Sequence, residues 1–275
     1  MTSRIGAVTL GLAVLLALAG CSGEEKADSR PDRPSTPASS ATAWQPILGP
    51  DGRCGEQPAA VTRAGFEERV LEDPDVGEVR AVTAGRGRTV AVLLHQTSGG
   101  GLCGWLPFAA RLVAKPGVQV VAIDLCGYGE SRCHNDYTLT GQVDSVRVAI
   151  DTAVDELAAE RVVVVGASMG GSVALMTAVL DDRVDSAVDL SGPVEWDGMD
   201  VVRRGRALRV PVLVSMADDE GEAAVQRARE IATRAPAGSR FVPAPSGHGY
   251  ELLIDSDGRP GRLAVPVTRW VRSGS

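Results

Sequence analysis

The stretch that decides the fold spans residues 162 to 171 and reads Val162-Val163-Val164-Val165-Gly166-Ala167-Ser168-Met169-Gly170-Gly171. Four consecutive valines predict a strand that is buried on both faces, as in a parallel sheet. The residues that follow the serine have the pattern of a helix. A strand that turns sharply into a helix needs small residues two before and two after the serine, so that the two elements can approach closely. The sequence therefore predicts that Ser168 lies on a strained turn at the carboxyl edge of a sheet.

On both sides of this stretch, short β-rich runs alternate with helical patterns. The predicted strands cover residues 66–71, 79–83, 89–94, 118–124, 162–165, 186–190, 210–216 and 240–242. The predicted helices cover residues 105–114, 138–160, 169–180, 221–235 and 263–271. This order predicts an α/β fold, with a mostly parallel sheet of about eight strands and helices on both faces. The segment between the strands at 186–190 and 210–216 is too short to hold a large cap domain.

A serine hydroxyl is a weak nucleophile at neutral pH and needs a base, which in turn needs an orienting acid. His248 is the one histidine that follows Ser168, and it lies in a loop of small residues after the last predicted strand. Such a loop lets an imidazole reach over the edge of the sheet, so His248 is the candidate base. His95 and His134 precede the serine and are expected to be structural.

The acid is harder to choose, because three carboxylates stand together where a predicted strand ends. These are Asp218, Asp219 and Glu220. We assign the role to Asp219 and keep its two neighbours as alternatives, since a carboxylate at such a position also caps a following helix. Asp197 and Asp200, after the preceding strand, are more distant alternatives.

Two further motifs extend this interpretation. Leu93-Leu94-His95-Gln96 is similar to a strand-end His-Gly segment, and residues 124–131 fit the pattern D-x-x-G-x-G-x-S. Together with the serine turn, they make the chain resemble the α/β-hydrolase superfamily over about residues 65 to 272. The resemblance implies the chain order serine, acid, histidine. It also implies chemistry that needs neither a metal ion nor an organic cofactor.

The resemblance further implies two backbone N–H groups that bind the oxyanion of the reaction. One belongs to Met169, directly after the serine, and the second to Gln96 or Thr97. Gln96 stands where the family usually has glycine, but a glycine run at residues 99–101 supplies a pliable loop.

The N-terminus predicts export. Arg4 precedes an apolar run over residues 8–19 that is too short to span a membrane. Leu18-Ala19-Gly20-Cys21 resembles the lipobox of bacterial lipoproteins. We therefore expect a signal peptide over residues 1–20, a disordered tether over 21–46 and the hydrolase domain over 47–275. Acylation of Cys21 would then anchor the protein to the cell membrane on its extracytoplasmic face; an ordinary cleaved secretory signal is the alternative.

Four cysteines remain: Cys54, Cys103, Cys126 and Cys133. An even number in an oxidising compartment predicts two disulfides, with buried free thiols as the alternative. In the family that the chain resembles, the loops carrying the last three emerge side by side. The resemblance therefore implies that Cys103 pairs with Cys126 or Cys133, and that the remaining one pairs with Cys54. Their spacing does not suggest a zinc site.

The charge balance excludes one class of partner. The formal net charge is −7, so the chain lacks the basic surface that binding to nucleic acid needs. We expect a monomeric serine hydrolase that acts on small-molecule or lipid-like carboxylic esters. A lipase or serine peptidase with the same triad, or a catalytically silent hydrolase fold that binds a partner, are the alternatives. Trp105 and Trp196 are candidates for lining the acyl pocket.

Overall fold

The computed structural model describes residues 44–97, 100–196, 199–204, 207–255 and 258–274. The predicted signal peptide, the predicted lipidation site at Cys21, the acid candidate Asp197 and most of the predicted tether lie outside these residues. Trp44 already contacts the folded part, where its ring lies under the guanidinium of Arg132. Among the described helices, none is long and apolar enough to cross a membrane.

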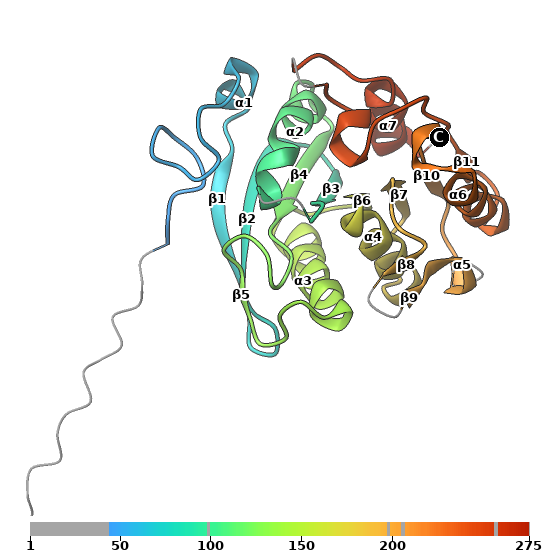
Figure 1. Ribbon diagram of the computed structural model, residues 1–275. Helices are drawn as coiled ribbons and strands as arrows, with labels where there is room; N and C mark the ends of the chain where they lie inside the picture. Colours follow the sequence, from blue (N-terminus) through green and yellow to red (C-terminus); the bar gives the residue numbers. More distant parts are fainter. Residues whose placement is uncertain (1–43, 98–99, 197–198, 205–206, 256–257, 275) are drawn as a thin grey trace, which may run out of the picture. The chain divides into compact units, whose positions relative to one another are not determined.

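A mixed sheet of nine strands runs through the described part of the chain (Figure 1). Its order is β1 (Glu67–Asp73), β2 (Gly77–Arg86), β4 (Val118–Ile123), β3 (Thr89–Leu94), β6 (Arg161–Ala167), β7 (Ser186–Leu190), β10 (Val212–Ser215) and β11 (Arg240–Phe241), with β5 (Arg132–Cys133) beside β2. All pairs from β4 to β11 are parallel, whereas β2 pairs with β1, β4 and β5 in antiparallel fashion. The predicted mostly parallel sheet is thereby confirmed.

Helices cover both faces of this sheet (Figure 1). One face packs against α3 (Leu139–Asp151), α4 (Met169–Leu180) and α6 (Glu222–Arg234), and the other against α2 (Leu106–Val113) and α7 (Ala264–Ser273). The four-valine run follows from this arrangement: Val162 and Val164 belong to the first core, and Val163 and Val165 to the second. A central strand covered on both sides needs apolar residues at every position.

Several short elements add to the predicted ones. They are α1 (Ala59–Ala64), the 3₁₀ helices η1 (Gly101–Trp105), η4 (Asp218–Glu220) and η5 (Gly249–Leu252), a π-helical turn η2 (Thr152–Glu156), the hairpin of β8 (Glu195–Trp196) and β9 (Met199–Asp200), and α5 (Val201–Arg204). Between β7 and β10, the described residues form only the small hairpin and α5. This agrees with the expectation that no large cap covers the carboxyl edge of the sheet.

Candidate active site

Ser168 occupies the tight turn between β6 and α4. Its φ of 50° and ψ of −122° are strained for a residue with a side chain. The Ser168 N–H donates to the Leu190 carbonyl oxygen at 2.8 Å, which fixes the turn against β7. A Cβ on Gly166 would lie 1.9 Å from the Gly170 carbonyl oxygen, and one on Gly170 would lie 2.3 Å from that of Leu94. The structure therefore has the strained turn that the glycine spacing predicts.

His248 lies opposite, in the loop that precedes η5. Its Nδ1 is 2.9 Å from Glu220 Oε2, and its backbone N–H donates to Glu251 Oε2 at 3.2 Å. The His248 side chain is 46 % exposed, whereas that of Glu220 is 20 % exposed. The imidazole is thus held by a partly shielded carboxylate while one side stays accessible.

The carboxylate that contacts His248 is therefore Glu220, which was one of the alternatives, and not the expected Asp219. Asp219 Oδ2 instead accepts a hydrogen bond from the Gly247 N–H at 3.3 Å, so it supports the backbone of the histidine loop. Glu220 reaches the imidazole because it comes last in η4 and has a longer side chain. Of the more distant alternatives, Asp200 accepts from the Arg203 N–H and caps α5.

The contact between Glu220 and His248 shifts both groups towards their charged forms. The Glu220 hydrogen bond raises the pKa of His248 above its ordinary value, more than burial lowers it. Burial raises the pKa of Glu220, but its polar contacts, of which the hydrogen bond with His248 has the largest effect, together outweigh burial, so that the pKa of Glu220 lies below its ordinary value. Glu220 therefore favours the imidazolium that forms whenever His248 accepts a proton.

A further carboxyl group, Asp189, is buried beneath the site. Its Oδ1 accepts from the Gly192 N–H at 2.7 Å, and burial raises its pKa to about 7. A Cβ on Gly171 or on Gly192 would lie within 2.3 Å of this oxygen, so a side chain at either position would displace the Asp189 carboxyl group. No sequence pattern marks Asp189 as a site residue, because in the sequence it is one residue of an ordinary strand.

The predicted oxyanion donors lie in two segments. Met169 is the first residue of α4, so its N–H has no acceptor inside the helix and lies at the positive end of the helix dipole. The Gln96 N–H donates to the hydroxyl of Tyr250 at 3.1 Å, and this bond leaves Thr97 as the second donor candidate. Tyr250 was not identified from sequence either, since nothing in the spacing links residue 250 to residue 96.

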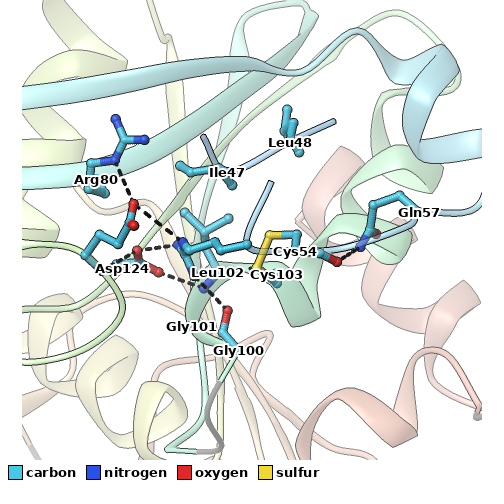
Figure 2. Close-up of a disulfide and its surroundings, with 12 residues drawn as sticks. Ile47, Leu48, Cys54, Gln57, Arg80, Gly100, Gly101, Leu102, Cys103 and Asp124 are labelled. Atoms are coloured by element: carbon cyan, nitrogen blue, oxygen red, sulfur yellow. Dashed lines mark hydrogen bonds and ion pairs between the residues drawn. A yellow bond between two sulfur atoms is a disulfide. The ribbon is translucent and has the colours of Figure 1, made fainter. Parts of the chain in front are cut away.

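The segment after β3 is tied to the start of the fold by a disulfide between Cys54 and Cys103, shown in Figure 2. The guanidinium of Arg53 donates to the Gly100 carbonyl oxygen at 3.1 Å and forms an ion pair with the buried Asp124. Asp124 Oδ1 in turn accepts from the Leu102 N–H at 2.9 Å. Residues 100–103 are therefore held from two sides.

The second disulfide joins Cys126 to Cys133, so two disulfides are present and the predicted pairing of Cys103 is wrong. Cys126 and Cys133 are seven positions apart and close the turn of the D-x-x-G-x-G-x-S motif on itself. Within that turn, Ser131 Oγ donates to the Asp124 carbonyl oxygen at 2.7 Å. The chain therefore folds back locally at Cys126 and Cys133, and Cys103 pairs with Cys54 instead.

A pocket of about 490 Å³ opens between Ser168 and His248. Its apolar lining comes from Pro193, Val194, Met216, Ala223 and Ala224, and its charged lining from Glu195, Glu220 and Arg227. The two tryptophans considered as candidates for the acyl pocket are not among its lining residues. Trp105 is fully buried against Phe108 and Tyr250, and Trp196 donates to Gln142 Oε1 at 3.3 Å.

Comparison with known protein families shows the class to which this fold and site belong. Residues 90–248, more than half of the chain, match the family described as the alpha/beta hydrolase fold, and the chain belongs to that family. No curated protein matches the sequence.

Solved structures show the same fold at low sequence identity. The esterase Pf2001 of Pyrococcus furiosus is 13 % identical, with a TM-score of 0.64 over 79 % of this chain and 97 % of that one. A predicted CIB-like hydrolase from Thermoplasma acidophilum is 21 % identical, with a TM-score of 0.60 over 76 % and 98 % of the two chains. Naproxen esterase (carboxylesterase NP) from Bacillus subtilis is 15 % identical, with a TM-score of 0.58 over 77 % and 94 %.

Proposed function

We propose that this protein is a serine hydrolase that cleaves small carboxylic esters through Ser168, His248 and Glu220. One observation carries the proposal: Ser168 on its strained turn and His248, bonded to Glu220 at 2.9 Å, line the same pocket. A nucleophile, a base and an orienting acid that converge on one cavity are the parts that acyl transfer needs. The likeness to esterase folds is consistent with this chemistry.

In the proposed reaction, Ser168 Oγ attacks the carbonyl carbon while His248 Nε2 accepts its proton. The carbonyl π electrons move onto oxygen, where the Met169 and Thr97 N–H groups stabilise the negative charge. The tetrahedral intermediate collapses, the carbon–oxygen bond to the alcohol breaks, and His248 returns the proton to that alcohol. Water then attacks the acyl-enzyme by the same route and releases the acid, with Ser168 restored.

The size and lining of the pocket favour a short substrate. A volume of about 490 Å³ suits a small ester better than a folded peptide segment or a long lipid chain. The short segment between β7 and β10 adds only a hairpin and α5 in its described residues, which gives little material for a lid. These features weigh against the lipase and peptidase alternatives.

Labelling with a fluorophosphonate, together with hydrolysis of p-nitrophenyl esters of increasing acyl length, tests this function. We expect wild-type protein to react and to prefer short acyl groups, while Ser168→Ala and His248→Ala lose activity and keep their fold. A wild-type protein that neither reacts nor hydrolyses any ester would support the catalytically silent alternative.

We also propose that the enzyme is a lipoprotein anchored through Cys21 at the extracytoplasmic face of the membrane. The lipobox-like sequence before Cys21 and the two disulfides of the folded domain support this location, because disulfides persist in oxidising compartments. The two or three acyl chains of a bacterial lipoprotein would hold it stably. Cys21→Ser protein is expected in the soluble fraction; its complete sedimentation with membranes would contradict the proposal.

A further inference from the structure

The peptide group between Gln96 and Thr97 is oriented by a buried histidine. His95 Nε2 accepts from the Leu125 N–H at 3.0 Å, so the ring proton is on Nδ1, which donates to the Gln96 carbonyl oxygen at 2.8 Å. Burial lowers the pKa of His95, which keeps this neutral tautomer. In a trans peptide the carbonyl and the following N–H point in opposite directions. With the Gln96 carbonyl turned towards His95, the Thr97 N–H points the other way.

Tyr250 holds the other side of Gln96. Its hydroxyl accepts from the Gln96 N–H at 3.1 Å and donates to the Gly101 carbonyl oxygen at 3.3 Å. The Tyr250 backbone N–H also donates to Gln96 Oε1 at 3.4 Å, so two hydrogen bonds join residues 96 and 250. A glycine at position 96, usual in the family, has no side chain to accept this bond.

The residues around Tyr250 leave room for its ring and for its contact with Gln96. Its ring packs edge-on against the ring of Trp105, with centroids 5.1 Å apart. A Cβ on Gly104 would lie 2.3 Å from the Tyr250 ring, and a Cβ on Gly249 would lie 2.1 Å from Gln96 Oε1. Gly104 and Gly249, which lie in separate segments, thus both leave room for the contact between Tyr250 and Gln96.

Tyr250 comes two residues after His248, so this contact joins the histidine loop directly to the segment that follows β3. We propose that Tyr250, paired with Gln96, is a positioning residue that fixes the imidazole of His248 relative to the oxyanion donor at Thr97. The inference rests on the proposed hydrolase function and deepens it. It assigns Gln96, the departure from the family's glycine, a role in holding two parts of the catalytic machinery together.

Removing only the hydroxyl tests the proposal. In Tyr250→Phe, the Gln96 N–H and the Gly101 carbonyl lose their shared partner while the ring packing on Trp105 remains. Displacements of about 1 Å between reacting groups cost about 100-fold in rate, so we expect kcat to fall about 10- to 100-fold. KM should stay within about threefold, because the pocket lining is untouched. Affinity for an alkylboronic acid, which forms a tetrahedral adduct with the serine, should fall in parallel with kcat.

Tyr137→Phe is the matched control, since this tyrosine is 67 % exposed and packs on Tyr128 instead. Gln96→Gly, which keeps the N–H bond and loses the side-chain bond, should lose only part of the activity that Tyr250→Phe loses. If Ser168-dependent activity is present but Tyr250→Phe leaves kcat unchanged, or Tyr137→Phe lowers kcat equally, the positioning role of Tyr250 is overturned while the proposed function stands. Wild-type protein without esterase activity would overturn the proposed function, and the positioning role with it.

Discussion

At the scale of single residues, Asp219 and Glu220 differ by one methylene group and one position, yet their carboxylates have different partners. Asp219 supports the backbone at Gly247, while Glu220 bonds the imidazole of His248. Sequence spacing does not separate such neighbours, because both lie in the same helical turn. The outcome depends on side-chain reach and on the direction in which η4 leaves the strand.

This difference gives a ranking of variants. Glu220→Gln keeps the shape of the side chain but removes the charge that orients the imidazole and stabilises the imidazolium. We expect kcat to fall about 10²- to 10⁴-fold. Asp219→Asn retains a carbonyl oxygen that can accept from Gly247, so its kcat should stay within about threefold. Steady-state ester hydrolysis measures both, and the reverse ranking would return the role to Asp219.

The same contact sets the pH dependence. His248 accepts a proton only when neutral, so kcat/KM should fall as pH drops through its pKa. Because Glu220 raises that pKa, the midpoint of the acid limb should lie above the ordinary value of about 6.5. The midpoint should move to lower pH in Glu220→Gln, and less far in Asp189→Asn, since the charge of Asp189 contributes least to the shift. A midpoint that stays in place in Glu220→Gln would contradict this origin.

At the scale of elements, the junction of β6 with α4 depends on glycines that let backbone touch backbone. In Gly170→Ala the new Cβ would meet the Leu94 carbonyl oxygen at 2.3 Å, and neither strand nor helix can yield easily. We expect the free energy of unfolding to fall by at least about 2 kcal/mol. Gly100→Ala is the control, because its Cβ would find its nearest neighbour at 3.7 Å. Denaturant unfolding that shows equal effects for both variants would refute the argument.

The same scale shows why sequence predicts some elements well and others poorly. The strands Thr89–Leu94 and Ser186–Leu190 and the helix Met169–Leu180 have the bounds that their apolar patterns predict. Those patterns are strong because both faces of the sheet are covered. Two-residue strands such as β8 and β9, and the short helix α5, have no periodicity long enough to detect.

Contacts between loops were the least predictable part of the site. The serine turn and His248 follow from local motifs and chain order. The bonds of Tyr250 with Gln96 and the disulfide of Cys54 with Cys103 join segments 154 and 49 positions apart. Their formation depends on how the loops leave the sheet, which no local pattern specifies.

At the scale of the whole molecule, the two disulfides close loops of very different length. Cys54–Cys103 closes a separation of 49 residues and Cys126–Cys133 one of 7. Loop-closure entropy gives about 4 kcal/mol for the first and about 2 kcal/mol for the second. The double variant Cys54→Ser/Cys103→Ser should therefore lose more unfolding free energy than Cys126→Ser/Cys133→Ser.

Activity should separate the two pairs as well. Cys103 lies at the end of the segment that Arg53 and Asp124 hold, whereas Cys126 and Cys133 staple a turn to itself. We expect a several-fold loss of kcat in the folded Cys54→Ser/Cys103→Ser protein. Thermal unfolding measured beside ester hydrolysis tests both expectations. If the two double variants lost equal free energy of unfolding and equal kcat, neither the loop length nor the position of each disulfide would determine its effect.

The Cys54–Cys103 bond also changes how the molecule carries mechanical load. A stretching force applied to the chain before Trp44 is transmitted through the disulfide from Cys54 to Cys103, so the chain of residues 55–102 does not bear it. Helix α1 and strands β1, β2 and β3 lie within this protected segment. For a separation of 49 residues the hidden contour length is about 170 Å. A reductant should release that length in a pulling experiment, so the protein extends less under tension while the bond is intact.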